Sequence, residues 1–275
     1  MPSSQTNMQS PDNLTPLRIH AVNYIGLYTL IYREVGRFLA VYTRTIVAPV
    51  ITTLLYYTIF ALAFGGVQHQ AVNGISFLRF LAPGLIMMSM VQNAFANTSS
   101  SIMISKIQGN IVDVLMPPLS SLELFVGFVT GGVVRGLVVG CVTGSVMSLF
   151  VPIHIEHVFH VIVFAVLGCY LLSALGIAAG IWSEKFDHIA AVTNFVVMPM
   201  TFLSGTFYSM SKLPELWQGI ARLNPFFYMI DGFRSGFIGM GDSAFLHGVV
   251  ILGAVDVFLT LLALWMLRTG YKIKS

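Results

Sequence analysis

Residues 196–208 read VVMPMTFLSGTFY, and residues 209–234 continue as SMSKLPELWQGIARLNPFFYMIDGFR. The apolar run is interrupted at Pro199 and Gly205, and the segment that follows is half apolar and half polar. Helix-breaking residues at membrane depth leave backbone N–H and C=O groups without partners, and lipid cannot hydrogen-bond to them. Such backbone must therefore lie against protein or line a water-filled cavity. The pattern is therefore more typical of a protein that encloses a passage than of a simple membrane anchor.

The composition excludes a soluble protein. The chain has 275 residues, of which 56% are hydrophobic and only 9% are charged, whereas a soluble domain carries about 25% charged residues. We therefore expect an all-α integral membrane protein. The net charge of +3 is too small to indicate a nucleic-acid partner. Cys141 and Cys169 both fall in apolar runs, where cysteine acts as a small hydrophobe.

Runs of about 18 or more apolar residues predict membrane helices. Six such runs are present, at 45–66, 80–104, 122–151, 158–182, 189–208 and 245–267. The third is long enough to tilt or to extend beyond the hydrocarbon, and the fifth, which contains Pro199 and Gly205, is expected to be broken or kinked. The predicted organisation is a polar tail over residues 1–18, with no sign of a cleaved signal peptide, and one transmembrane domain over residues 19–275.

Lysines and arginines near the ends of spans favour the cytoplasmic side. With the N-terminus inside, the inner segments hold Arg18, Arg33, Arg37, Arg44, Lys106, Lys185, Arg268, Lys272 and Lys274. The outer segments hold only Arg79, Lys212, Arg222 and Arg234. This asymmetry predicts that both termini are cytoplasmic.

Residues 24–44 have helical periodicity. One predicted face is apolar and consists of Tyr24, Leu27, Ile31, Val35, Phe38 and Tyr42. The opposite face carries Arg33, Arg37 and Arg44. The pattern predicts an amphipathic helix in the cytoplasmic interface, with arginines that reach lipid phosphates or a partner. A simple orientation signal for the first span is an equally good interpretation.

The third span carries a glycine at every fourth position, at Gly132, Gly136, Gly140 and Gly144. Small residues at this spacing let another helix approach closely. We interpret the four glycines as a helix-packing face, with a role in lining a passage as the alternative.

A few polar residues fall inside the spans. Arg135 lies near the middle of the third span and must face protein or water; Asp256, in the last span, is its hypothetical partner. Asn93, Asn97 and Asn194 either bond between helices, which we favour, or line a passage.

The outer loop VPIHIEHVFH holds His154, Glu156, His157 and His160. Imidazoles at this spacing can bind zinc, but a surface loop that happens to carry histidines is commoner, so we predict no metal site. The chain has no nucleophilic triad and no GxxxxGK[ST] phosphate loop. It is therefore not expected to be an enzyme, to bind a cofactor or to hydrolyse ATP by itself.

Four stretches together carry a family resemblance: VAPVITTLLYY (47–57), FLAPGLIMMS (80–89), NAFAN (93–97) and LNPFFYMIDGFR (223–234). With PMTFLSGTFY (199–208), they resemble the type-2 permeases of ATP-binding cassette transporters, which are six-span bacterial exporters. The resemblance covers nearly the whole chain after about residue 20.

The resemblance implies a bacterial cytoplasmic (inner) membrane location and a homodimer bound to two ATPase subunits, which carry ATP and Mg²⁺. It also implies an outer re-entrant segment between spans five and six, around residues 213–231, and an inner coupling helix at 106–120 that docks on the ATPase. The implied re-entrant residues are Pro199, Gly205, Pro214, Asn224 and Pro225. The implied coupling residues are Gln108, Asn110, Asp113, Leu115 and Pro118, flanked by Arg33 and Arg37. Related chains often have an Arg-Glu pair where this chain has Gln108 and Asn110.

The sequence itself also favours transport that is powered by a separate protein. A membrane chain without a nucleotide site needs a stiff cytoplasmic lever, and the segment 113–119 ends in Pro117 and Pro118, which terminate a helix. The leading function is the permease of an exporter for an amphipathic, drug-like, lipid-linked or glycan substrate. The alternatives are a stand-alone secondary transporter or channel, for which only Asp256 offers an ion-coupling group, and an intramembrane enzyme.

Overall fold

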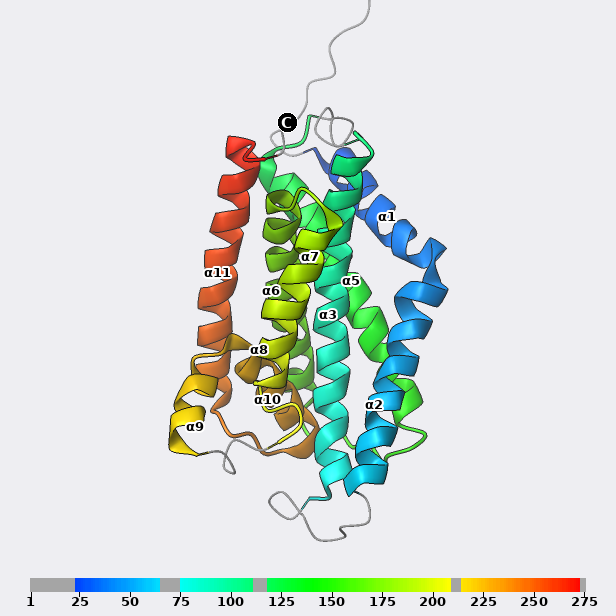
Figure 1. The fold of residues 1–275 in the computed structure, drawn as a ribbon, viewed down its shortest axis with the longest axis vertical. Helices are drawn as coiled ribbons and strands as arrows, with labels where there is room; N and C mark the ends of the chain where they lie inside the picture. The colour runs from blue at the N-terminus through cyan, green and yellow to red at the C-terminus, as the bar shows by residue number, and fades with distance from the viewer. Residues whose placement is uncertain (1–22, 65–74, 111–117, 209–213, 273–275) are drawn as a thin grey trace, which may run out of the picture.

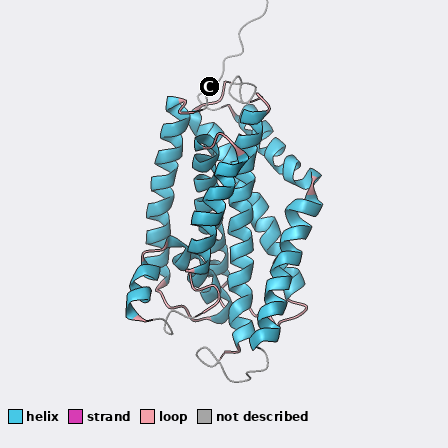
Figure 2. Ribbon diagram, in the orientation of Figure 1, coloured by secondary structure: helices cyan, strands magenta, loops and turns pink. Residues whose placement is uncertain are grey.

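The computed structural model describes residues 23–64, 75–110, 118–208 and 214–272. Every regular element in these ranges is helical (Figure 2). The elements are α1 (Tyr24–Ala40), η1 (Thr43–Val47), α2 (Ala48–Phe64), α3 (Phe77–Ile107), α5 (Ser121–Met147), α6 (Val158–Trp182), α7 (Phe186–Val192), η2 (Thr193–Val197), α8 (Met198–Phe202), α9 (Glu215–Arg222), α10 (Pro225–Ile238) and α11 (Phe245–Thr269). The all-helical expectation is therefore confirmed.

Within the described ranges, four helices are long and apolar enough to cross a membrane. They are Thr43–Ala63, Ser121–Met147, Val158–Trp182 and Phe245–Thr269, and they coincide with the first, third, fourth and sixth expected spans. The second expected span lies inside α3 and the fifth lies on α7, η2 and α8. The third span is shorter than predicted, because α5 ends at Met147 and residues 148–150 form turns.

The bundle is built around α3 and α6, which pack against each other and against α5. Figure 1 shows α11 on one flank of these helices and α2 on the other. We call the end that contains the last turn of α3 and the C-terminal end of α11 the Lys106 end. The short helices α9 and α10 lie at the opposite end, which we call the α10 end (Figure 1).

The helices differ in how much of their surface the chain itself covers. In the most apolar window of α6, 61% of the residues are buried, whereas in the window of η1 and α2 only 17% are buried. Exposed apolar side chains run along α2 at Ile51, Leu55, Ile59 and Leu62. The α2 flank is therefore the less covered of two sides that lipid or another chain must cover; the other is the α11 flank, where 28% of the most apolar window is buried.

Two π-helical segments precede prolines. The segment η1 ends two residues before Pro49, and η2 ends two residues before Pro199. Proline donates no N–H and its ring clashes with the carbonyl four residues earlier, and a wider π turn relieves that clash. Beyond Pro199 the helix ends at Phe202, and Gly205 follows with φ of +77°. The predicted break in the fifth span is confirmed, but it is a widened turn followed by a stop.

Candidate functional site

Polar side chains recur at every fourth position along α3, at Ser89, Asn93, Asn97, Ser101 and Ser105. This spacing puts them on one face of the helix, and all five are buried. They bond to three different elements: to α3 itself, to α1 and to α5. The face is therefore a line of polar contacts inside the bundle.

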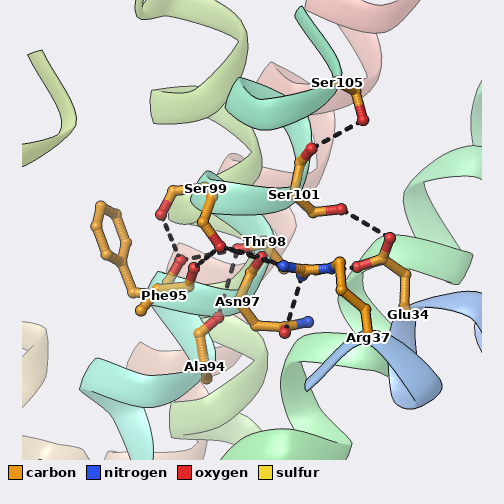
Figure 3. Close-up of polar contacts among 11 residues, drawn as sticks. Glu34, Arg37, Ala94, Phe95, Asn97, Thr98, Ser99, Ser101 and Ser105 are labelled. Carbon is orange, nitrogen blue, oxygen red and sulfur yellow. Dashed lines mark hydrogen bonds and ion pairs between the residues drawn. The ribbon is translucent and has the colours of Figure 1, made fainter. Parts of the chain in front are cut away.

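The strongest contacts on this line join α1 to α3 (Figure 3). The carboxylate of Glu34 is fully buried; it accepts a hydrogen bond from Ser101 Oγ at 2.7 Å and pairs with Arg37 at 3.0 Å. Arg37 Nη2 also donates to the backbone oxygen and the Oδ1 of Asn97, at 2.9 and 3.0 Å. We call this group, Glu34, Arg37, Asn97 and Ser101, the α1–α3 joint.

The α1–α3 joint corrects the predicted polarity of the N-terminal helix. Arg37 turns inward to α3, and the buried face of α1 is Leu30, Glu34 and Phe38. Tyr24 and Tyr42, which were predicted on the apolar face, are exposed. Arg33 is exposed, as predicted. A carboxylate therefore lies on the packed face of α1.

Arg135 does not pair with Asp256, so that hypothesis is wrong. Its Nη2 donates to Asn93 Oδ1 at 2.9 Å, which ties α5 to the polar line of α3. Asp256 is buried in α11, and neither of its carboxylate oxygens has a hydrogen-bond partner in the described part of the chain. The guanidinium of Arg135 can reach the side-chain amide of Asn93 because α5 and α3, which carry these two residues, pack together.

The glycines of α5 have close neighbours on two sides. A Cβ at Gly132 would lie 2.3 Å from Ser173 Oγ of α6, and one at Gly136 would lie 3.0 Å from the backbone oxygen of Met90. At Gly140 the nearest atoms, at 2.4–2.9 Å, belong to the flexible side chain of Met90, and at Gly144 the Cβ would meet only Ile86, at 3.8 Å. The ladder thus runs from tight contact at Gly132 to open contact at Gly144.

Two further glycines, Gly127 and Gly131, lie against α1. A Cβ at these positions would lie 2.4 Å from Leu30 Cδ2 and 2.6 Å from Glu34 Cβ, respectively. These glycines therefore let α1 approach α5 closely enough for Glu34 to reach α3.

A second joint holds the break after α8. The buried Arg234 of α10 donates from Nη2 to the backbone oxygen of Gly205 at 2.7 Å, and its guanidinium lies 3.7 Å from the ring centroid of Phe80. Asn224 caps α10 by accepting from the backbone N–H of Phe226, and its Nδ2 donates to the oxygen of Met200 at 2.7 Å. We call Asn224, Arg234 and the carbonyls that they bind the α8–α10 joint.

The predicted re-entrant residues surround this joint. Pro225 is the first residue of α10, where proline suits a helix start, and Pro214 precedes α9. Asp231 of α10 accepts from the backbone N–H groups of Asp242 and Ser243, at 3.0 and 2.8 Å. The NP stretch thus sets the start of α10, while Asp231 and Arg234 of DGFR tie the helix to the loop that follows it and to the turn after α8.

The Lys106 end is held by caps. Lys106 Nζ donates to the carbonyl of Ile181, in the last turn of α6, at 2.8 Å and to that of Ser183, the residue that follows α6, at 2.5 Å. Glu123 closes a capping box with Ser120 and accepts from the backbone N–H of Asn23 at 2.5 Å, so the starts of α5 and α1 are tied together.

The predicted coupling residues lie near these caps where the structure describes them. Asn110 bonds Gln108 at 3.4 Å, and the backbone oxygen of Pro118 accepts from Asn23. Asp113 and Leu115 lie outside the described residues. Their contact with a partner stays a prediction.

Two predicted groups remain apart from the joints. Asn194 is exposed on η2, and its side chain has no hydrogen-bond partner among the residues described. His160 faces Ser235 Oγ at 3.1 Å and stacks on Phe245. Within the same residues, no group of three or more His, Cys, Asp or Glu side chains is placed to hold a metal ion.

Sequence reasoning missed Glu34 and Arg234 as the centres of the two joints. Glu34 lies four residues after Leu30 and four before Phe38, so it shares their helix face. That spacing could have marked it as buried. For Arg234 no such signal exists, because its partners are backbone carbonyls.

This architecture, with long apolar helices outside and buried polar joints inside, is that of a helical membrane protein. The family described as ABC-2 type transporter matches residues 26–238. The chain is 37% identical over 252 residues to the inner membrane transport permease YadH of Escherichia coli K12, over 92% of this chain and 98% of the relative. It is 28% identical over 212 residues to nodulation protein J of Rhizobium leguminosarum bv. viciae, over 75% of this chain and 81% of the relative.

The chain therefore belongs to the ABC-2 type transporter family. It is a membrane permease, and the predicted resemblance is confirmed. Members of this family are transport subunits that normally work with an ATPase subunit.

Proposed function

We propose that this chain is the permease of an ATP-driven exporter in a bacterial cytoplasmic membrane. It moves an amphipathic, drug-like, lipid-linked or glycan substrate outward, with power from a separate ATPase subunit. The observation that carries this proposal is the family match over residues 26–238. The name of the Escherichia coli relative, an inner membrane transport permease, supports the location.

The permease crosses the membrane six times. Its second span is α3, whose 31 residues give a length of about 46 Å, more than the hydrocarbon core of about 30 Å. The polar residues that lower the hydropathy of α3 bond to α1 and α5, so they need no contact with lipid. The fifth span is the continuous helix from Phe186 to Phe202, about 25 Å long.

Both termini lie in the cytoplasm. In support, six spans are an even number, and basic residues are in excess near the Lys106 end. The helix α1 then lies at the cytoplasmic face, and α10 is the outer re-entrant element. In support, α10 lies with α9 at the end of the bundle opposite to Lys106 (Figure 1), and Arg234 binds it to the break after α8.

Two copies of the chain form the passage. The support is the α2 flank, which the chain itself leaves largely uncovered. A second copy related by a two-fold axis would cover part of this flank, with lipid on the remainder.

The ATPase docks at the Lys106 end, on the segment 106–120 and the start of α1. In support, this segment is tied to α1 through Asn23 and Pro118, and to α6 through Lys106. A push on the segment therefore reaches α1, α5 and α6 together. The α1–α3 joint then transmits the movement to the middle of the bundle.

Co-purification tests the proposal. The tagged chain is expressed in its native host, solubilised in mild detergent and isolated, and its partners are identified by mass spectrometry. We expect an ATP-binding cassette ATPase in equal amount, and a native mass that corresponds to two copies of each chain. A chain that purifies alone and carries out ion-gradient-driven uptake into liposomes would instead establish the stand-alone transporter.

A further inference from the structure

A cavity of about 280 Å³ lies between α2 and α3. Its walls come from residues one turn apart on the two helices, which run in opposite directions (Figure 1). Ala48, Thr52 and Tyr56 line it from α2, and Leu85, Met88 and Gln92 line it from α3. Arg44 of η1 closes one end. We call this cavity the α2–α3 cleft; its volume is near the lower end of small-molecule sites, about 300 Å³.

One end of the α2–α3 cleft presents hydrogen-bond donors without partners. Arg44 is exposed, and its side chain makes no hydrogen bond or ion pair within the described residues, so its charge is free for a ligand at the mouth of the cleft. The Nε2 of Gln92 is buried and has no hydrogen-bond partner there. A buried amide N–H that lacks a partner costs free energy until an acceptor arrives. This end of the cleft therefore lacks an acceptor.

The charges around this end are positive. Asn93 also lines the cleft, and its Oδ1 is occupied by the guanidinium of the buried Arg135, whose Nε has no partner in the described ranges. No carboxylate lines the cleft. The neighbouring carboxylate of Glu34 is already bound by Arg37 and Ser101. Arg44 and Arg135 thus supply an excess of positive charge that no described side chain neutralises.

The other end of the α2–α3 cleft carries no charge, and the hydroxyls of Thr52 and Thr53 on its wall already donate to carbonyls of α2 itself. Tyr56 lies twelve residues after Arg44, about 18 Å further along the helix, and Leu85 faces it from α3. Pro49 and Met88 line the wall between the two ends. The cleft therefore joins a cationic, donor-rich end to an uncharged end. This arrangement suits a ligand with an anionic head and an apolar chain.

We propose that the α2–α3 cleft binds an anionic amphiphile. The phosphate or similar oxyanion group lies against Arg44 and the amide of Gln92, and the apolar part lies along Met88, Leu85 and Tyr56. That an anionic amphiphile is also the transported substrate rests on the proposed function, whereas its binding in the cleft does not. The family match and the names of the relatives specify no such site.

Matched single-chain probes test this site. The full chain in a neutral detergent is titrated with dodecyl phosphate, dodecyltrimethylammonium and inorganic phosphate, and bound probe is counted by native mass spectrometry. We expect dodecyl phosphate to bind at least tenfold more tightly than the cation of equal chain length, because the donors and positive charges select an anion. Inorganic phosphate, which lacks the apolar part, is expected to bind far more weakly. Equal binding of the cation, or of inorganic phosphate, would overturn the proposal.

Variants place the probe in the cleft. Arg44→Gln is expected to weaken dodecyl phosphate binding about tenfold, and Arg44→Lys, which keeps the charge, to retain most of it. Ala48→Trp, at an exposed position on the cleft wall, is expected to block binding by filling the space. The control is Arg268→Gln, the same change at an exposed arginine of α11, which leaves binding unchanged. Wild-type affinity in both Arg44→Gln and Ala48→Trp would overturn the site.

The failure of the site and the failure of the proposed function give different results. If an ATPase co-purifies but dodecyl phosphate does not bind, the transporter stands and the anion site falls. If dodecyl phosphate binds and Arg44→Gln abolishes it, but no ATPase is found, the site stands and the exporter proposal falls.

Discussion

The α1–α3 joint and the α8–α10 joint are each centred on an arginine, half-buried in the first and buried in the second, and the two arginines find their partners in different ways. Arg37 binds mainly side chains, those of Glu34 and Asn97, across two separate helices. Arg234 binds backbone carbonyls of one turn that is also held by Asn224. The comparison contrasts a joint made by side chains of two helices with a joint that holds the backbone of a turn at the α10 end.

The largest effect is expected from removing Arg234. In Arg234→Leu the oxygens of Gly205 and Thr206 lose their donor and the contact with Phe80 is lost. We expect about 3 kcal/mol of destabilisation, measured by unfolding in mixed micelles with tryptophan fluorescence. Arg234→Lys, which keeps one donor group, should lie between this variant and wild type. A Leu variant as stable as wild type would remove the α8–α10 joint from this account.

A smaller loss is expected at the α1–α3 joint. Glu34→Ala leaves Arg37 without its anion and Ser101 without its acceptor. We expect this variant to be destabilised by about 2 kcal/mol. The loss is smaller than for a fully buried pair because the side chain of Arg37 is 27% exposed. The double change Glu34→Leu with Arg37→Met should recover most of the stability, since apolar replacement of both partners removes the buried charge. Equal stability of the single and double variants would show that the pair is not coupled.

Much of the helical layout was predictable because lipid demands long apolar runs. The positions of five expected spans agree with α2, α3, α5, α6 and α11 to within a few residues. The hydropathy of α3 is lower than that of the others, since its polar line serves contacts inside the bundle. The break in the fifth span followed from Pro199 and Gly205, but the π turns did not, because proline alone does not say how the helix widens.

The partners of the buried polar groups were not predictable. Hydropathy gives the depth of Arg135 but not the rotation of α5. It therefore favours Asp256, the acidic residue at a similar depth, over the partner that the structure has, Asn93. Glu34 was missed because three neighbouring arginines suggested a wholly polar outer face on α1. Side-chain pairing depends on helix rotation, which a single sequence leaves open.

The glycines of α5 test how much close helix packing contributes to stability. Gly136→Ala would push a methyl group against the Met90 oxygen and Cys169 Sγ, and we expect a loss of about 1–2 kcal/mol. Gly144→Ala is the matched control: it meets only Ile86 at 3.8 Å, so the better helix propensity of alanine should leave stability unchanged or slightly higher. The same unfolding assay compares them, and equal losses would argue against the graded ladder.

The smallest effect is expected at the exposed ion pair of Glu184 and Lys272, 2.7 Å apart. Hydrogen bonding to Lys272 holds the pKa of Glu184 below its usual range, and the same bond raises the pKa of Lys272. The stability that Glu184 contributes to the folded state is therefore fully present above its unfolded-state pKa. It is lost as the pH falls through the lowered folded-state pKa. The contribution of Lys272 is lost only as the pH rises through its raised pKa.

Melting temperatures of wild type and Lys272→Gln, measured against pH, check this pair. We expect a small difference near neutral pH that disappears in acid and in high salt, because exposed pairs are screened. A difference as large as that of Glu34→Ala would contradict the contrast between exposed and buried pairs.

The central claim is that power enters this permease from an ATPase bound at the Lys106 end. ATP turnover of the co-purified ATPase, measured in nanodiscs with and without this chain, tests it most directly. We predict that turnover rises several-fold when the chain is present and that Glu34→Ala reduces the rise without dissociating the complex. Turnover that is the same with and without the chain would contradict the account.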